Sequence, residues 1–452
     1  MSYRSSLRAV HAAWALAIAL PATAAQPALD SLLAPRLPGL VQTYQFLHAN
    51  PELSHYEVKT SAFLAVELRK LGFTVTEGIG KFQRPEWQGH GIAAVLRNGP
   101  GPTVLVRTDM DALPVEEKTG LPYASKVRVK NEAGQEVGVM HACGHDIHMT
   151  SMLGTAALLV QLKAQWSGTL VIIGQPAEET IDGARAMLAD GLYDKLPTID
   201  YALALHDNGD FEAGKVGIVP GYAMASATSV DITVRGAGGH GSRPELAKDP
   251  IVLASQIVLA LQTIVSRENS PLDPAVVTVG SFHGGTRYNI IPDEVKLQLT
   301  VRTYKEETRQ RILAAIDRIA KGTALAAGIP DSLLPITKAS ESEVTPSLYN
   351  NPELTERLAA RLKGVLGDGN VIEVSPVMAS EDFGSFALPG NRIPAVMLWL
   401  GAMDPEKIEE GRRAGKPFSI ALHSPFFAPL PEPTIRTGVT VMTTAVLDLL
   451  GK

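Results

Sequence analysis

The stretch that decides the fold is Thr169-Leu170-Val171-Ile172-Ile173-Gly174-Gln175-Pro176-Ala177-Glu178-Glu179. Its first five residues are apolar or β-branched without alternation, which predicts a strand that is buried on both faces of a sheet. The run then ends in a glycine, a proline and two adjacent carboxylates. In open α/β sheets, ligands bind beyond the carboxyl ends of the strands, so these carboxylates are candidates for a functional site.

Two further strands of the same kind flank this stretch. Residues 103–107 form an apolar run that ends at Thr108-Asp109-Met110-Asp111, and residues 201–205 form another. Segments with helical spacing of apolar residues separate the three runs, at residues 149–166 and 183–196. This alternation predicts an α/β fold with a mixed, mainly parallel sheet and helices on both faces.

Polar side chains follow all three strands and would meet at one edge of the sheet. They are Asp109, Asp111, Glu178, Glu179 and His206. Adjacent side chains in an extended segment point in opposite directions, so one of the two glutamates can bind a metal while the other serves as a base. The residues alone also fit a simpler interpretation, in which the glutamates are solvated and His206 caps a strand.

The alternation of apolar strands and helices changes after residue 222. Residues 223–337 have the strand and helix order β-α-β-β-α-β, which is typical of the ferredoxin-like unit. Helix and strand patterns of the first kind resume in residues 338–452. We therefore expect one catalytic domain formed by residues 25–222 and 338–452, with a smaller α+β domain inserted into it.

The N-terminus has the pattern of a secretory signal peptide. Arg4 and Arg8 precede an apolar run at residues 9–20, and Ala22-Thr23-Ala24 provides a small-x-small cleavage site. The alternative, an uncleaved membrane anchor, would need a longer apolar run. We expect residues 1–24 to be removed and the protein to be exported, periplasmic or secreted, and free of the membrane. The formal net charge of −6 argues against a nucleic-acid-binding surface.

The chain has one cysteine among 452 residues, in His141-Ala142-Cys143-Gly144-His145-Asp146-Ile147-His148. A single cysteine forms no internal disulfide, so the thiol is free for other chemistry. A thiolate two residues before an imidazole can place sulfur and nitrogen on one metal ion, and this pair suits zinc and its neighbours. The spacing alone also fits a buried cysteine beside polar loop residues.

These segments resemble the M20 family of dinuclear metallo-aminoacylases and carboxypeptidases. The resemblance is strongest to the branch of hippurate hydrolases and auxin-amino-acid conjugate hydrolases. It extends in collinear order over nearly all of the chain after the signal peptide. The matching segments are His48-Ala49-Asn50-Pro51-Glu52-Leu53-Ser54, Arg107-Thr108-Asp109-Met110-Asp111-Ala112-Leu113-Pro114, Met140-His141-Ala142-Cys143-Gly144-His145, Gln175-Pro176-Ala177-Glu178-Glu179, Asn289-Ile290-Ile291-Pro292 and Ser380-Glu381-Asp382-Phe383.

The resemblance implies a site with two divalent metal ions. Its ligands would be Cys143, His145, Glu179, His206 and His423, with Cys143 in the bridging place. Zinc is the first choice because of the thiolate, and manganese or cobalt are possible replacements. The resemblance also implies that a metal-activated water attacks the amide bond of an N-acyl or N-aroyl amino acid. Glu178 would be the general base, and the inserted domain a lid that carries the contact of a homodimer.

Other residues have candidate roles around this centre. Asp109 or Asp111 would orient a histidine ligand or hold the loop. In the inserted domain, His240 lies in a glycine-rich loop and could stabilise an oxyanion, although it also fits a surface histidine. Asn289 and Arg302 suit recognition of a substrate carboxylate, and Arg302 also fits an exposed strand residue.

Several functions compete on this pattern. A dipeptidase or carboxypeptidase would use the same metals on peptides. A catalytically silent, exported binding protein would not need the intact Glu178 and ligand set, and a thiol hydrolase based on Cys143 leaves the converging carboxylates unexplained. The chain departs from its relatives after His206, and in long loops at residues 82–88 and 127–137. These departures bear on substrate identity more than on reaction type.

Overall fold

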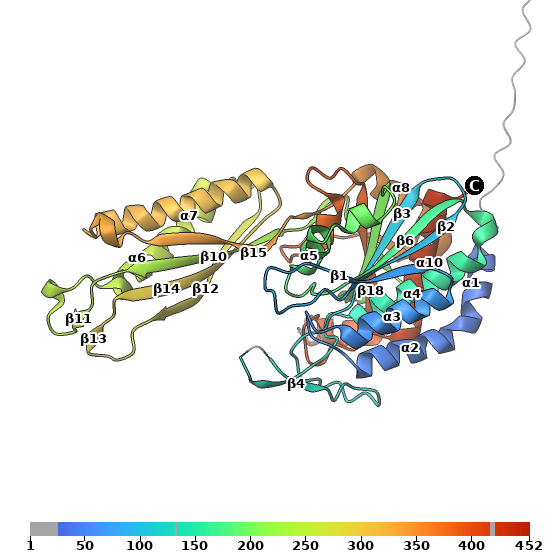
Figure 1. Cartoon of the computed structure of the whole chain (residues 1–452), viewed down its shortest axis with the longest axis horizontal. Helices are drawn as coiled ribbons and strands as arrows, with labels where there is room; N and C mark the ends of the chain where they lie inside the picture. The colour runs from blue at the N-terminus through green and yellow to red at the C-terminus, as the bar shows by residue number, and fades with distance from the viewer. Residues whose placement is uncertain (1–25, 132, 416–420) are drawn as a thin grey trace, which may run out of the picture.

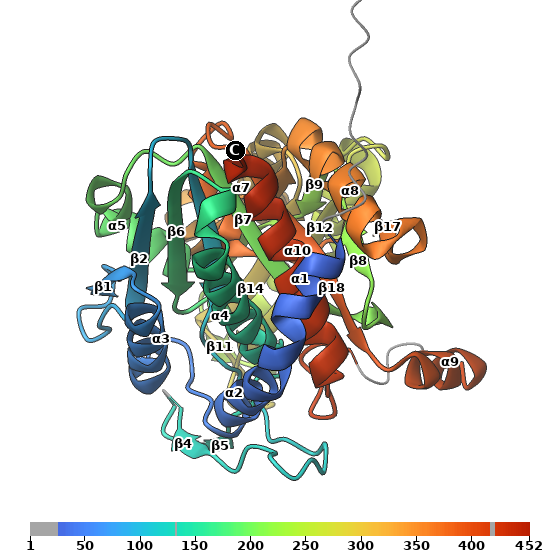
Figure 2. The same cartoon turned by 90° about the vertical axis from the view of Figure 1, so that its right-hand side faces the viewer.

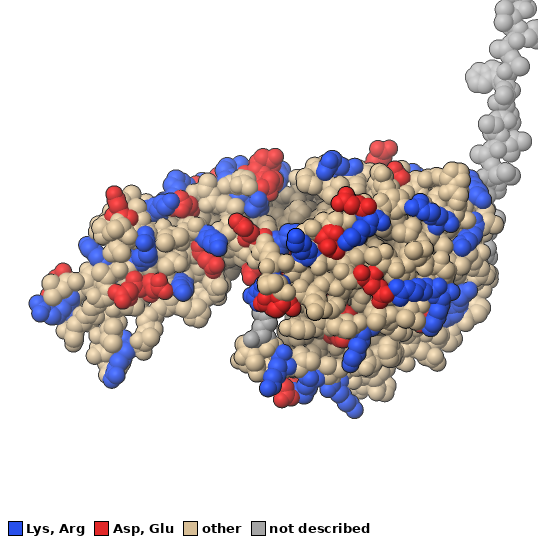
Figure 3. All heavy atoms as spheres, viewed as in Figure 1, with Lys and Arg blue, Asp and Glu red and all other residues tan. Residues whose placement is uncertain are grey.

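A computed structural model of the chain describes residues 26–131, 133–415 and 421–452. The predicted signal peptide lies outside the described residues. The chain forms a large body around one sheet, and a smaller elongated domain extends from it, here called the lid (Figure 1). On the face seen in Figure 3, basic and acidic side chains are interspersed over both parts, and a hollow separates the lid from the body.

The body contains an eight-stranded sheet in the order β1-β2-β6-β3-β7-β18-β8-β17. The four central strands β6, β3, β7 and β18 are parallel to one another, and antiparallel pairs join β1 to β2, β2 to β6 and β18 to β8. The predicted mixed, mainly parallel sheet is therefore confirmed. The strands are β1 (Thr74–Ile79), β2 (Gly91–Asn98), β3 (Thr103–Asp109), β6 (Gly168–Gln175), β7 (Tyr201–Glu212), β8 (Val216–Ile218), β17 (Val371–Glu373) and β18 (Ala395–Met403).

Helices cover both faces of this sheet because alternate side chains of each central strand enter different cores. Leu170 and Ile172 of β6 belong to one core, whereas Val171 and Ile173 belong to the other. The first face carries the helices seen in front of the sheet in Figure 2, namely α1 (Gln26–Leu33), α2 (Leu37–Ala49), α3 (Val58–Lys70), α4 (His145–Gln161) and α10 (Pro431–Leu450), and α8 (Pro352–Leu366) joins the same core. The opposite face carries α5 (Gly183–Ala189) and the 3-10 helix η9 (Asp382–Ala387).

The lid contains a four-stranded antiparallel sheet in the order β12-β14-β10-β15, with two helices packed on it. This is the ferredoxin-like order that the sequence predicts. Its elements are β10 (Ser226–Arg235), α6 (Pro250–Thr263), β12 (Ala275–Gly284), β14 (Glu294–Thr303), α7 (Glu306–Ala326) and β15 (Ile336–Thr345). β15 begins at Ile336 and continues to Thr345, so the lid extends beyond the expected domain limit of residue 337 before the chain returns to the body.

Short elements complete the structure. A small pairing of β11 (Gly239–His240) with β13 (Ile290–Ile291) forms the far end of the lid (Figure 1). The loop at 127–137 forms a hairpin of β4 (Arg128–Lys130) and β5 (Glu136–Gly138), and the remaining elements are β9 (Gly221–Met224), β16 (Leu348–Asn350) and α9 (Pro405–Arg413). A π-helical turn at Ile264–Glu268 continues α6 of the lid. In the described part of the chain, this combined helix, Pro250–Glu268, is the one helix long and apolar enough to cross a membrane.

Candidate metal centre

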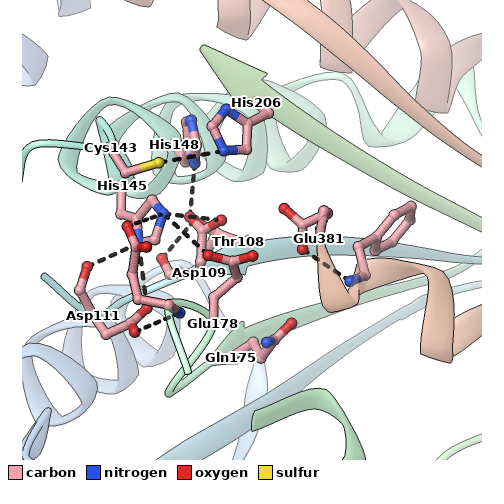
Figure 4. Close-up of polar contacts among 12 residues, drawn as sticks. Thr108, Asp109, Asp111, Cys143, His145, His148, Gln175, Glu178, His206 and Glu381 are labelled. Carbon is pink, nitrogen blue, oxygen red and sulfur yellow. Dashed lines mark hydrogen bonds and ion pairs between the residues drawn. The ribbon is translucent and has the colours of Figure 1, made fainter. Parts of the chain in front are cut away.

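The loop before α4 presents Cys143 and His145 on either side of Gly144. Gly144 has a left-handed backbone with φ of +74°, which glycine adopts without strain. Both flanking side chains are buried, and the Cys143 sulfur lies 3.6 Å from Nε2 of His206 at the end of the apolar part of β7. The candidate ligand atoms of Cys143, His145 and His206 all lie within 4.8 Å of one another. Figure 4 shows the sulfur and the two imidazoles converging.

A second group shares the same sulfur. Cys143, Glu179 and His423 also have ligand atoms within 4.8 Å of one another, and His423 Nε2 lies 3.5 Å from Glu179 Oε2. A third group joins His145 to Glu178 and Glu179. The structure therefore brings together all five residues expected to bind metal, and Cys143 belongs to two of the groups.

Main-chain carbonyls fix the two central imidazoles in the form that binds a metal. His145 Nδ1 donates to the carbonyl of Asp111 at 2.8 Å, and His206 Nδ1 donates to the carbonyl of Asp207 at 2.7 Å. Each Nε2 is thereby left facing the cluster, as in ligand histidines. Burial lowers the pKa of His145, but the carboxylates of Asp109 and Asp111 outweigh it and raise this pKa above its usual value. Burial also lowers the pKa of His206 to about 4, which keeps this imidazole neutral.

Negative groups are concentrated in the cluster. Burial, followed by the charges of Glu179 and Glu178, raises the pKa of the Cys143 thiol. Burial raises the pKa of Glu179 to about 7 as well. Oε1 of Glu179 and Nε2 of His145 are buried without a hydrogen-bond partner among the residues that the structure describes. A thiol, imidazoles and a carboxylate left in this state fit divalent cations, which would supply both the missing charge and the missing partners.

Asp111 and Asp109 hold the loops around the cluster. The carboxylate of Asp111 accepts hydrogen bonds from Ser54 Oγ at 2.6 Å and from the backbone nitrogen of Glu179 at 3.0 Å. Asp109 accepts a hydrogen bond from His148 Nδ1 at 2.7 Å, and His148 in turn accepts one from the backbone nitrogen of Asp207. The two aspartates thereby connect the ends of β3 and β7, the start of α4 and the loop after β6.

Sequence reasoning assigned no role to a buried ionic network beside Glu178. Arg107 donates to Asp109 at 2.7 Å and to Glu381 at 2.8 Å, and Gln175 donates to Asp382 at 2.6 Å. The motif around Glu381 and the single arginine in an otherwise apolar strand were the available signals. Figure 4 places Glu381 on the far side of Glu178 from the histidines.

The lid residues expected at the site lie elsewhere. His240 is exposed in β11 at the far end of the lid, where Ser242 Oγ contacts its Nδ1 at 2.9 Å. Asn289 is exposed beside it and accepts a hydrogen bond from Gly241 N. Arg302 of β14 is half-buried near the body and donates to Ser380 Oγ. In this arrangement of the chain, His240 and Asn289 do not reach the cluster.

The sequence of the chain matches a known peptidase family and several of its characterised relatives. A sequence model of the peptidase family M20/M25/M40 matches residues 105–445. The chain is 40% identical over 342 residues to hippurate hydrolase of Campylobacter jejuni, which covers 75% of this chain and 82% of that protein. It is 36% identical over 370 residues to thermostable carboxypeptidase 2 of Saccharolobus solfataricus, with 81% and 87% covered.

A solved structure supports the same grouping. The YxeP protein of Bacillus subtilis, described as a dinuclear metal-binding peptidase from the M20 family, superposes with a TM-score of 0.70 at 28% identity and covers 93% of this chain and 100% of that one. The cluster built on Cys143 and His145 lies within the matched residues. The protein is therefore a metal-dependent amidohydrolase, and the chain belongs to the peptidase family M20/M25/M40.

Proposed function

We propose that the protein hydrolyses the amide bond of N-acyl or N-aroyl amino acids, with Glu178 as the general base. The observation that carries this proposal is that the adjacent carboxylates of Glu178 and Glu179 have different neighbours. Both lie 3.9 Å from His145 Nε2, but Glu179 also shares a ligand group with Cys143 and His423, whereas Glu178 lies near the network of Arg107 and Glu381. The likeness to hippurate hydrolase supports an N-acyl amino acid as the substrate.

Five residues would hold two divalent cations in this proposal, with zinc as the first choice and manganese or cobalt as replacements. They are Cys143, His145, Glu179, His206 and His423. Cys143 would take the shared position, since its sulfur lies near His145 and His206 in one ligand group and near Glu179 and His423 in another. Cations bound there would polarise the amide carbonyl and acidify a water molecule.

Glu178 would move the proton in this reaction. Burial raises the pKa of its carboxyl, the charges of Glu381 and Glu179 act in the same direction, and Arg107 opposes them. A carboxylate with a raised pKa accepts a proton from water more readily at neutral pH and can then return it to the leaving nitrogen. Asp111, through its hydrogen bond from the backbone of Glu179, would keep the two carboxylates in their separate directions.

The lid would complete the site in a homodimer. We infer that Asn289 and Arg302 recognise the substrate carboxylate and that His240 stabilises the oxyanion. Two features of the lid support a contact with a second copy. β12 is an edge strand of the lid sheet, and α6 exposes Val252 and Leu259, at 55% and 73% of their surfaces. The N-terminal pattern supports export of the assembled protein.

Replacement of Glu178 by Gln tests the proposal. In zinc-reconstituted protein, Glu178→Gln should lower the hydrolysis of N-benzoyl and N-acetyl amino acids by at least ~100-fold, because the base is lost. Its zinc content should stay near that of the wild type. Glu179→Gln is the matched control, and it should lose zinc. Loss of zinc from Glu178→Gln instead would show that the two roles are reversed, and undiminished activity would exclude Glu178 as the base.

The likeness to a carboxypeptidase favours a second candidate function, cleavage of peptides by the same centre. The same reconstituted protein distinguishes the two when it is assayed on a panel of N-acyl amino acids and unmodified dipeptides. Higher kcat/KM on dipeptides would replace the first proposal with the second.

A further inference from the structure

A cavity of about 700 Å³ opens beside Glu179, which forms part of its wall. Small-molecule sites in proteins typically have volumes of about 300–1,000 Å³. The apolar part of its wall consists of Leu53, Leu113, Pro114 and three aromatic residues, His55, Tyr56 and Trp87. Trp87 belongs to the loop at residues 82–88, and Asn131 of the hairpin at 127–137 also lines the cavity. Both long loops of this chain therefore border one cavity that reaches a proposed metal ligand.

The loop at 82–88 presents a packed aromatic surface. The indole of Trp87 stacks on the imidazole of His55 with ring centroids 3.6 Å apart and planes 8° from parallel. Phe82 contacts both rings edge-on, at 4.9 Å from His55 and 6.0 Å from Trp87. The guanidinium of Arg84 lies 4.5 Å from the centre of the indole. These contacts hold the half-buried Trp87 in one orientation at the cavity.

The aromatic surface is joined to the loop that carries the two glutamates. His55 Nε2 lies 3.2 Å from the carboxylate of Asp182, which also accepts a hydrogen bond from Thr180. Glu57 Oε1 accepts hydrogen bonds from the backbone nitrogens of His55 and Ala177, at 3.1 Å and 2.7 Å. His55 and Ala177 have positive φ angles of 71° and 51°, so these contacts maintain a strained backbone at His55, which lines the cavity, and at Ala177, which precedes the two glutamates.

The opposite rim of the cavity belongs to the strand that leads back from the lid. Ser342 and Glu343 of β15 line it, and Arg185 of α5 donates to the carbonyl of Ser342 at 2.5 Å. Arg302, proposed to recognise the substrate carboxylate, lies on β14, and β10 separates β14 from β15. A substrate with its carboxylate at Arg302 and its amide at the metal cluster would have this cavity, which Glu179 lines, available for its acyl group.

We propose that this cavity receives the acyl group of the substrate and that Trp87 selects flat, aromatic acyl groups. This inference rests on the proposed function and adds a residue that determines specificity. Planar rings bind to aromatic residues by offset stacking or edge-to-face contact. His55 and Arg84 lie against the faces of the indole, so Trp87 offers its ring edge to the cavity, and the exposed Tyr56 offers a further ring.

The test compares two substrates that differ only in the acyl group, N-benzoylglycine and N-acetylglycine. In the zinc-reconstituted full chain, Trp87→Ala should reduce the ratio of kcat/KM values for benzoyl over acetyl by ~10-fold or more, since the ring contact and its buried area are lost. Trp87→Phe, which retains a ring, should keep most of the ratio. Phe46→Ala, which removes an exposed aromatic of α2 outside the cavity, should leave the ratio unchanged.

Other outcomes would overturn the inference without affecting the proposed function. Equal losses on both substrates would show that Trp87 only supports the catalytic loop, and an unchanged ratio would place the acyl group elsewhere. If the wild type hydrolyses neither substrate, the proposed function fails, and binding then decides the inference. Calorimetry with N-benzoylglycine should show at least ~10-fold weaker binding to Glu178→Gln/Trp87→Ala than to Glu178→Gln. Equal affinity of these two variants would refute the role of Trp87.

Discussion

Gly144 should tolerate no side chain, because two independent effects act on it. Its φ of +74° is a conformation in which other residues pay about 1–2 kcal/mol. A Cβ placed on Gly144 would also overlap the carboxylate of Asp207. Forcing an additional carbon into a packed site typically costs about 1–3 kcal/mol. Gly144→Ala should therefore lower the free energy of unfolding by about 2–5 kcal/mol.

A matched glycine separates the two effects. Gly120 has the same φ of +74° but no atom within 4 Å of a Cβ placed on it. Gly120→Ala should thus show only the backbone cost of about 1–2 kcal/mol. In a double-mutant cycle, Asp207→Ala should remove the overlap and reduce the cost of Gly144→Ala to a similar value. Urea denaturation in the presence of a chelator measures these differences without a contribution from bound metal.

Zinc binding by the loop around Gly144 should weaken together with the stability of the protein. Cys143 and His145 flank Gly144, so a displacement of the loop moves two proposed metal ligands at once. Gly144→Ala should bind less zinc than the wild type at equal free zinc, whereas Gly120→Ala should bind the same amount. Equal destabilisation by the two alanines, or a cost at Gly144 that Asp207→Ala leaves unchanged, would refute the assignment of the overlap.

Two further predictions concern a buried histidine and the lid. Asp146 and Glu117, which lie 2.7 and 3.1 Å from His48, outweigh its burial and raise the pKa of this histidine from 6.5 to about 10. Because the folded value is above the unfolded one, its stabilisation is fully present below pH 6.5 and is lost as the pH rises to about 10. The difference in unfolding free energy between the wild type and His48→Gln should shrink over this range in urea titrations, and a constant difference would contradict the ion pairs. If His240 acts on the site of a second copy, a mixture of inactive His240→Ala and Glu178→Gln proteins should recover part of the activity, because one site of each hybrid is intact. No recovery in a verified hybrid would place His240 in its own chain.

The fold could be predicted because burial leaves a direct trace in the sequence. Strands covered on both faces have few polar positions, so the runs at 103–107, 169–173 and 201–205 were recognisable and became β3, β6 and β7. The same rule located the edge where Asp109, Glu178 and His206 meet. The sequence did not show that β7 continues to Glu212, since its polar second half has no such pattern.

The supporting residues of the site were harder to predict because their partners are distant in the chain. His148 lies one helical turn into the apolar α4 and looks like a core residue until Asp109 and Asp207 are placed around it. Arg107 donates to Glu381, which is 274 positions further along. No local periodicity connects such pairs, and only the tertiary structure places Glu381, at the start of η9, beside Arg107 of β3.

The position of the lid is a property of tertiary structure that neither motif nor periodicity encodes. His240 and Asn289 lie at the end of the lid farthest from its two connections to the body, which are the start of β10 at Ser226 and the end of β15 at Thr345. The second connection is held by Arg185, which donates to the carbonyls of Glu341 and Ser342. A rotation that brought His240 to the cluster of its own chain would have to break or carry along these hydrogen bonds. A second copy could present the same tip without this rotation, and the exposed edge strand β12 and the apolar surface of α6 are available for that contact. We therefore propose that His240 serves the site of a second copy, which the mixture of His240→Ala and Glu178→Gln proteins tests.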